Sequence, residues 1–247
     1  MTFSPPEPAA EPAASPQARA LARSLAERRA ASAERLASFV AATRDLAAET
    51  GSSSFTVQQV VARSGQSLKS FYRLFAGKDD LLLALLEEDV ALGGVILAEL
   101  VGRHDDPGDR VRAWVDGVFD MLAAGEQGYV GVLVREHDRL AETHPDELEA
   151  ALAPLVDPLV VALDDAMAAG RVRPGDPVRD ARTVLDVVLA QIHRLVPMLA
   201  LVDDPAERAD RVAETARYAR DFCWGGLAAP PDDGPPSGGG PRAGRGR

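Results

Sequence analysis

The sequence of 247 residues contains a single cysteine, Cys223. One cysteine excludes a disulfide within the chain and a zinc site built from thiolates, and it fits a protein kept in a reducing cytosol. Aromatic residues make up only 5% of the sequence, whereas alanine, leucine and valine are abundant. This composition favours a core made by packing helix on helix.

Long apolar segments are also scarce. The longest, Val184–Val202, is interrupted by Asp186, Arg194 and Pro197, which makes it a poor membrane span. The N-terminal residues are rich in proline, alanine and glutamate and lack the apolar core of a signal peptide. We therefore expect a cytoplasmic protein without a membrane association.

Basic residues are in the minority, since the formal net charge is −11, but the deficit is uneven along the chain. Residues 1–80 have ten Lys and Arg against eight Asp and Glu, whereas residues 81–247 have seventeen against thirty. A basic N-terminal part on an acidic body is typical of a small DNA-reading domain carried by a body that DNA repels.

The stretch Phe55–Lys78 has the signals of two short helices joined by a tight turn. Thr56 and Gln59 have the spacing of a capping box, so a helix is expected to begin directly after Thr56. Gly65 can adopt the positive φ that ends this helix and turns the chain. Ser67 can cap the second helix. The pattern predicts a helix-turn-helix.

The second helix of this pair has an apolar and a polar face. Its apolar residues Leu68, Phe71 and Phe75 are predicted to point inward. The polar residues on the other face are Lys69, Ser70 and Arg73.

Periodic apolar positions predict helices through the rest of the chain, at about 32–50, 79–103, 111–124, 129–143, 145–169, 179–201 and 205–224. Pro154 and Pro158 are expected to kink the helix 145–169 and to prevent it from packing tightly. No segment alternates apolar and polar residues as a strand does. The expected fold class is therefore all-α, with a three-helix helix-turn-helix head and a larger helical body.

Between Phe55 and Leu82, particular residue types recur at fixed spacing around the helix pair. They are Phe55, Thr56, Gly65, Ser67, Tyr72, Phe75, Lys78, Asp79 and Leu81–Leu82. In type and spacing these residues resemble the TetR family of transcriptional regulators, and the resemblance covers roughly residues 32–86. The sequence departs from the family's usual residues at Gln66, Lys69 and Leu74.

The resemblance implies a homodimer whose two recognition helices enter successive major grooves of a palindromic DNA operator, about 34–36 Å apart. Lys69 and Gln66 are candidates for base edges, because lysine can donate to guanine and glutamine can bond adenine. For Tyr72 the alternative is a half-buried core tyrosine, and for Arg73 it is a solvated helix face. The candidates for phosphate contacts are Thr56, Ser67, Ser70, Tyr72, Arg73 and Lys78.

The resemblance also implies a body that binds an unidentified, largely apolar small-molecule effector, which releases a repressor from its operator. The candidates to line the ligand pocket are Trp114, Phe119, Tyr129, His137, Met167 and His193. For His137 and His193 the alternative is a histidine satisfied within the core.

The helix 179–201 is apolar around most of its circumference, with more apolar residues than the core of one protomer needs. The resemblance to the TetR family implies that, together with the last helix, it forms a four-helix interface in the homodimer.

On this basis the chain divides into four parts. Residues 1–28 are a disordered or partly helical extension, and residues 29–80 are the DNA-binding domain with its motif at 56–75. Residues 81–226 form the ligand-binding and dimerisation domain, and residues 227–247 are a disordered tail. The Arg-rich segment 17–29 is either a solvated helix end or a mobile basic arm that touches DNA.

An enzyme would need polar residues that converge on one point. The densest polar cluster is Glu136, His137, Asp138 and His144, and helical geometry points these side chains in different directions. We therefore expect no catalytic residues, no metal site and no cofactor. The alternative function is a helical protein-interaction or ligand-binding module that does not bind DNA.

Overall fold

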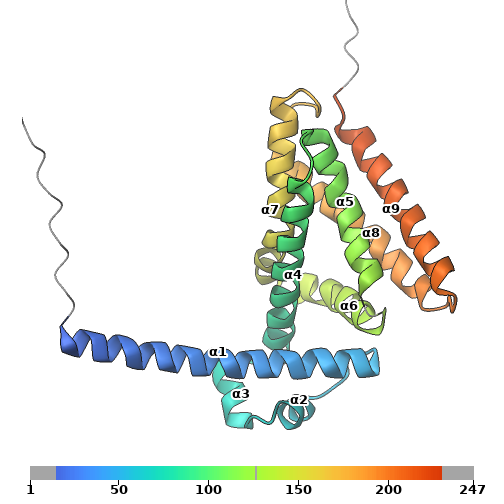
Figure 1. Cartoon of the computed structure of the whole chain (residues 1–247). Coiled ribbons are helices and arrows are strands. Elements are labelled where there is room, and N and C mark those ends of the chain that lie inside the picture. Colours follow the sequence, from blue (N-terminus) through green and yellow to red (C-terminus); the bar gives the residue numbers. More distant parts are fainter. Residues whose placement is uncertain (1–14, 126, 230–247) are drawn as a thin grey trace, which may run out of the picture.

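The computed structural model describes residues 15–125 and 127–229, and these residues form nine helices (Figure 1). Within them, the only strand-like feature is an isolated bridge between Val172 and Ala228. The predicted all-α fold is thereby confirmed, while the predictions for residues 1–14 and 230–247 lie outside the described residues. The helices are α1 (Pro16–Thr50), α2 (Val57–Ser64), α3 (Leu68–Leu74), α4 (Lys78–Gly102), α5 (Pro107–Ala124), α6 (Gln127–Thr143), α7 (Pro145–Ala168), α8 (Pro177–Leu199) and α9 (Pro205–Leu227).

The helix-turn-helix is formed by α2 and α3, which lie against one side of α1 (Figure 1). The hydroxyl of Thr56 accepts from the Gln59 amide at 3.2 Å, and the Gln59 side chain accepts from the Thr56 amide at 2.7 Å. Gly65 ends α2 with a φ of 66°, a conformation that a side chain would strain. Ser67 caps α3 by accepting from the Ser70 amide. The predicted helix pair is confirmed in its caps and its turn.

Three phenylalanines hold the head together. Phe39 of α1 meets the rings of Phe71 and Phe75 edge to face, at centroid distances of 5.5 and 6.0 Å. The prediction that Leu68 shares this buried face is wrong, because its side chain is 43% exposed. Leu68 is the first residue of α3, whereas the residues that contact Phe39 come about one turn or more later.

Helix α1 is longer than the sequence analysis predicts, since it begins at Pro16 rather than near Ser32. Residues 17–50 contain no glycine or proline, and their many alanines and arginines favour a continuous helix. The first half of α1 extends beyond the head without touching the body (Figure 1). Of the two alternatives for residues 17–29, the structure shows the helix.

The apolar core has two parts. The larger part lies among α5, α7, α8, α9 and the second half of α4, and it surrounds Trp114 and Phe119. The other part joins the head to the first half of α4 and continues to Leu140 of α6 and Leu148 of α7. Helix α4 therefore passes from head to body without a break, and a domain boundary at residue 80 stays a prediction.

The contact between α4 and α7 is tighter than the prolines of α7 led us to expect. A Cβ added to Gly94 would lie 2.4 Å from the carbonyl oxygen of Pro154, so only glycine allows this approach. Pro154 and Pro158 both lie inside the continuous helix α7. The prediction that they prevent tight packing is wrong at Gly94, where the missing side chain makes room for the proline.

Helix α8 buries its apolar residues within its own protomer, among them Val184, Val188, Ile192 and Leu195. The argument that they exceed what one protomer needs is therefore wrong, because α6, α7 and α9 pack against the helix and cover them. None of the helices in the described residues is long and apolar enough to cross a membrane.

Candidate nucleic-acid interface and adjoining cavity

The outer face of α3 carries exposed side chains of mixed chemistry. Lys69 and Arg73 are exposed, and neither forms an ion pair with any residue that the structure describes. Tyr72 is 59% exposed, and its ring is perpendicular to that of Phe71 at a centroid distance of 5.3 Å, so the alternative of a core tyrosine is wrong. Gln66 is half-buried in the turn before α3. This face offers two cations, an amide and a phenol to a partner.

The hydroxyls at the starts of α2 and α3 are used as caps. The oxygens of Thr56 and Ser67 each accept a backbone amide, and the Ser67 hydroxyl lies 3.0 Å from that of Ser70. Both hydroxyls also donate within the head, that of Thr56 to the Gln59 side-chain oxygen at 3.1 Å and that of Ser67 to Ser70. A phosphate contact from either hydroxyl would have to replace this hydrogen bond, because a hydroxyl has one proton to donate. The phosphate contacts of these residues stay a prediction.

Lys78 does not face outward. Its amine donates to the carbonyl oxygen of Ser53 and lies 4.8 Å from the centre of the Phe55 ring. Burial lowers the pKa of Lys78, because the charged amine is partly removed from water. The amine is thus committed to the loop between α1 and α2, and this placement argues against the predicted phosphate contact.

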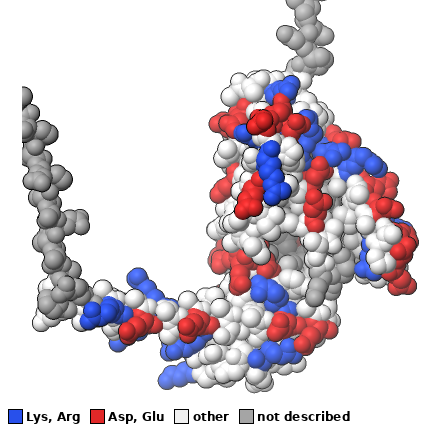
Figure 2. All heavy atoms as spheres, viewed as in Figure 1, with Lys and Arg blue, Asp and Glu red and all other residues white. Residues whose placement is uncertain are grey.

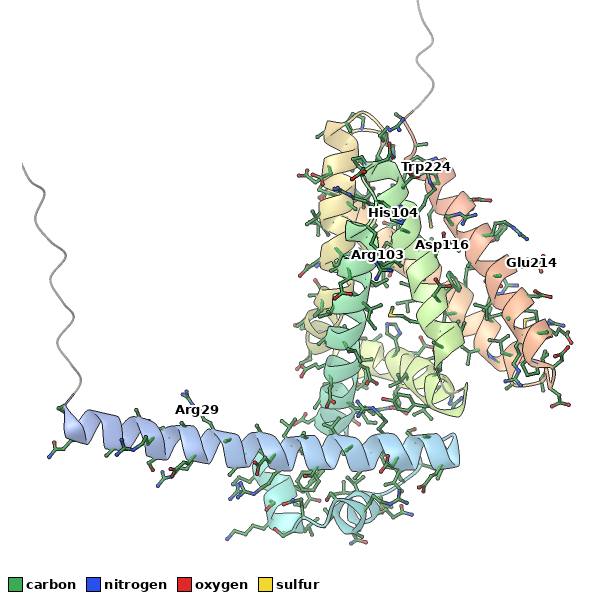
Figure 3. All side chains as sticks on the ribbon, in the orientation of Figure 1. Arg29, Arg103, His104, Asp116, Glu214 and Trp224 are labelled. Carbon is green, nitrogen blue, oxygen red and sulfur yellow. The ribbon has the colours of Figure 1, made fainter. Side chains whose placement is uncertain are left out.

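The first half of α1 adds basic side chains to the head. Arg23, Arg28, Arg29 and Arg35 form no ion pair within the described part of the chain. Figure 2 shows Lys and Arg along α1 and at the edge of the head farthest from the body. Arg29 points to the side of α1 opposite α2 and α3 (Figure 3). It therefore faces away from the surface on which α3 presents its polar side chains.

A cavity of about 480 Å³ lies between α4, α5, α6 and α8, above the head. Apolar side chains make most of its wall, and its polar side chains are Asp89, Tyr129, His137 and His193. Burial lowers the pKa of His137. The cavity fits the predicted apolar effector, with a few polar groups to orient it.

Three of the six predicted pocket residues line this cavity, namely Tyr129, His137 and His193. Trp114 does not: it is fully buried, and its indole donates to the Leu155 carbonyl at 2.8 Å. Phe119 is fully buried in the main core, against which Met167 also packs. A large aromatic side chain gains most when every side is covered, so it fills a core more often than it lines a cavity.

The cavity wall is bonded directly to the head. Asp89 of α4 accepts from Arg44 of α1 at 2.7 Å, and its other oxygen accepts from the Tyr129 hydroxyl of α6. Burial raises the pKa of Tyr129, so the phenol stays protonated and donates. Sequence reasoning missed Arg44 and Asp89, because a single charged residue on an amphipathic helix has no local signal for a partner 45 positions away.

A second set of bonds joins α6 to the loop after α1 and to the start of α4. Arg139 donates to both oxygens of Asp79, at 2.8 and 3.0 Å, and to Glu136 at 2.7 Å. Glu136 in turn accepts from the Ser53 hydroxyl at 2.5 Å. The hydrogen bonds from Arg139 lower the pKa of Asp79. Helix α6 is therefore a wall of the cavity on one side and a support of the head on the other.

Residues 39–85 match the family model described as bacterial regulatory proteins, tetR family. The match runs from Phe39 of α1 through the helix-turn-helix to Leu85 of α4. The head is a TetR-family domain. No curated protein matches the sequence.

Solved structures share the whole fold. A TetR family transcription regulator from Marinobacter aquaeolei has 19% identity and a TM-score of 0.56, covering 82% of this chain and all (100%) of its own. FadR from Bacillus subtilis, solved with stearoyl-CoA, has 17% identity and a TM-score of 0.59, covering 76% of this chain and 97% of its own. SmeT, the repressor of a multidrug efflux pump of Stenotrophomonas maltophilia, has 20% identity and a TM-score of 0.55, covering 78% and 90%.

At these identities the likeness to solved structures establishes the fold, and the family match identifies the head. The chain thus has the fold of a TetR-family transcriptional regulator, with the TetR-type DNA-binding domain at its head.

Proposed function

We propose that the protein is a transcriptional repressor that binds a palindromic operator as a homodimer and releases it when a small molecule enters the cavity. The observation that carries the proposal is the position of Asp89. Its carboxylate lines the cavity and also accepts a hydrogen bond from Arg44 of the head at 2.7 Å. An occupant of the cavity therefore meets a group that helps to hold the head in place.

In this proposal α3 is the recognition helix. Lys69 and Gln66 read base edges in the major groove, where lysine donates to guanine and glutamine bonds adenine. The groups that fix the register on the phosphates are Arg73, Tyr72 and the hydroxyls of Thr56, Ser67 and Ser70. Lys78 has an indirect role, since it holds the loop that precedes α2.

The homodimer is proposed to form through the outward faces of α8 and α9. Met198, Tyr218 and Phe222 are 49%, 62% and 60% exposed, although each is large and apolar. The rings of Tyr218 and Phe222 stack with their centres 6.3 Å apart and form a flat patch. Two copies joined here by a two-fold axis would match the symmetry of a palindromic operator.

The effector is proposed to be largely apolar, because the cavity wall is. Its polar end would meet Tyr129 and the two histidines that line the cavity. The fold's relative FadR, whose structure holds stearoyl-CoA, supports an effector with a long apolar part. Leu92 of α4 lines the cavity and is 63% exposed, so such a molecule is proposed to enter on this side.

Release would follow from competition for the same side chains. A ligand that bonds Tyr129 or displaces Asp89 weakens the hold on Arg44, and a shift of α6 disturbs Arg139 and its partner Asp79. The two heads then change their separation, and the state that fits the operator loses population. A differential affinity of about 1–3 kcal/mol between the two states is typical of such coupling.

The test of DNA binding uses the full chain and the DNA upstream of its own gene, followed by fluorescence anisotropy over a range of salt concentrations. Binding should weaken steeply as salt rises, because Lys and Arg displace counterions from phosphates. Lys69→Ala should lower the affinity for the cognate site about 5- to 150-fold, equivalent to about 1–3 kcal/mol. Arg103→Ala, which removes an exposed cation far from the head, should leave the affinity unchanged.

If the folded protein shows no salt-dependent binding to this DNA, the proposal fails. The chain is then a helical protein-interaction or ligand-binding module that uses the fold without reading DNA.

The dimer has a test of its own. Phe222→Glu should shift the protein from dimer to monomer in sedimentation velocity, because it places a charge in the apolar patch. Val161→Glu, a change at a 61% exposed position on α7, is the matched control and should leave the dimer intact.

A further inference from the structure

Two histidines and an aspartate meet where α6 passes α8, at the end of the cavity. His137 and Asp138 are neighbours on α6, and His193 lies on α8. The Asp138 carboxylate oxygen is 3.5 Å from Nδ1 of His137 and 3.4 Å from Nε2 of His193. The three ligand atoms all lie within 4.8 Å of one another. His193 is far from the other two residues in the sequence and lies on a different helix. No pattern within a single helix therefore indicates this group.

The two ring nitrogens that face the carboxylate have unmet bonding capacity. Nδ1 of His137 and Nε2 of His193 are buried, and neither has a hydrogen-bond partner among the described residues. A buried polar atom without a partner is rare in folded proteins, and a bound ion is one of the explanations for it. Here both such atoms face the same carboxylate oxygen.

The spacing of the three atoms matches that of ligands around one small cation. Zinc binds imidazole nitrogen and carboxylate oxygen at about 2.0–2.1 Å, which places neighbouring ligands of a tetrahedron about 3.3–3.4 Å apart. The separations of 3.4 and 3.5 Å agree with this value. The third separation, between the two nitrogens, is at most 4.8 Å.

We propose that His137, Asp138 and His193 form a binding site for a divalent transition-metal ion, with zinc as the best fit. Two imidazoles and one carboxylate suit zinc, cobalt, nickel or iron(II), whereas magnesium and calcium prefer sites made of oxygen alone. The site has three protein ligands. A fourth position therefore remains for water or for a donor atom of another molecule.

The cavity is where that fourth ligand would come from. Both histidines line the cavity, while the Asp138 side chain is 65% exposed to solvent. A small molecule with an apolar body and a carboxylate, hydroxamate or catecholate end could occupy the cavity and complete the coordination. This extension rests on the proposed function, whereas the metal site itself does not.

Isothermal titration calorimetry of the chelator-treated, untagged full chain with zinc chloride tests the site. The expected result is one zinc ion bound per protomer. His137→Ala and His193→Ala should each weaken binding more than about 100-fold, since even the loss of a residue that only orients a ligand costs 10- to 100-fold.

The chain has four histidines in all, so the double variant His104→Ala/His144→Ala is the matched control and should bind zinc as the wild type does. Asp138→Asn changes an exposed side chain that the fold does not need, and it should weaken binding while Glu142→Gln, one turn along α6, does not. Circular dichroism of each variant shows that it is folded. Absence of a site near one per protomer, or equal losses in the control, would overturn the proposal.

Cobalt(II) in place of zinc tests the fourth position. Intense visible absorption bands indicate four-coordinate cobalt, and acetohydroxamate should shift them by entering the coordination sphere. If the bands stay unchanged at saturating acetohydroxamate, the claim that the metal has a free fourth coordination position is wrong. The DNA-binding assay is independent of both measurements, so failure of the metal site and failure of the proposed repressor remain distinguishable.

Discussion

The outer face of α3 and the body use their basic residues differently. On α3, Lys69 and Arg73 are exposed and form no ion pair with the described residues. In the body, Arg110, Arg139 and Arg220 each bond an aspartate on another helix. A cation paired inside the body fixes how helices sit against each other, whereas an unpaired cation on the head is ready for phosphate. The outer face of α3 differs in this from α2 as well, where Arg63 bonds Glu49 of α1 at 2.7 Å.

A second contrast concerns the apolar core. The head has no core of its own, since the residues around Phe71 continue through Leu85 of α4 to Leu140 of α6. The region that would read DNA is therefore packed onto the same helices that line the cavity. Four substitutions test whether an exposed surface on α3 rests on a core that the head shares with the body.

The largest effect is expected for Phe71→Ala. Phe71 is fully buried and contacts Phe39 and Phe75, so its truncation should lower the free energy of unfolding by about 3–5 kcal/mol. Urea denaturation followed by circular dichroism measures the loss. Both tryptophans lie in the body, and their fluorescence should follow the same transition. A separate early loss of helix without a change in fluorescence would show that head and body unfold independently.

Gly94→Ala should come next. The new methyl group would meet the Pro154 carbonyl oxygen at 2.4 Å, which forces α4 and α7 apart and costs about 1–3 kcal/mol of unfolding free energy. Gly102→Ala is the matched control on the same helix, because its methyl group meets nothing within 4 Å. That change should be neutral or add up to about 1 kcal/mol. Equal destabilisation by both would contradict the close contact at Pro154.

Tyr129→Phe removes one hydrogen bond at the junction and keeps the ring. We expect a loss of about 0.5–1.5 kcal/mol in thermal or urea unfolding, typical of one hydrogen bond. Asp89 retains its bond to Arg44, so the head should stay folded and bind DNA. A response to the effector that is identical to the wild type would show that the phenol does not sense the cavity's occupant.

The smallest effect is expected on the stability of the protein at low pH. Hydrogen bonds from Arg139 lower the pKa of Asp79 in the folded state below its ordinary value of about 3.9. Such a carboxylate contributes stability that is fully present above that ordinary pKa and is lost as the pH falls through the folded value. Arg139→Met should therefore flatten the loss of stability below about pH 4, measured by urea unfolding between pH 3 and pH 7. Arg103→Met should leave the slope as it is.

How much the sequence predicts depends on the distance between interacting residues. The capping box of Thr56 and Gln59, the left-handed Gly65 and the cap at Ser67 are interactions within a few positions, and all are found as predicted. The two cavity histidines could be picked out because they are polar residues on apolar helix faces. Their convergence on one cavity depends on how α4, α6 and α8 cross, which no local pattern specifies.

The errors have a common physical origin. Trp114 is a predicted pocket residue, but its large apolar ring is buried in the core, where its N–H donates to a carbonyl. Lys78 was assigned to DNA by its charge, yet the folded loop offers its amine a carbonyl and a ring. In both cases the residue type was informative, and the partner was decided by residues distant in the chain.

Lys69 and Lys78 are the only lysines in the sequence, and the fold gives them opposite surroundings. Acylating reagents require an accessible, uncharged amine. Apart from the chain's α-amino group, one exposed amine therefore stands on α3, while the other is held against Ser53. Mild acetylation, by a reagent or by an enzyme, would remove one of the two cations on the outer face of α3 at a single atom.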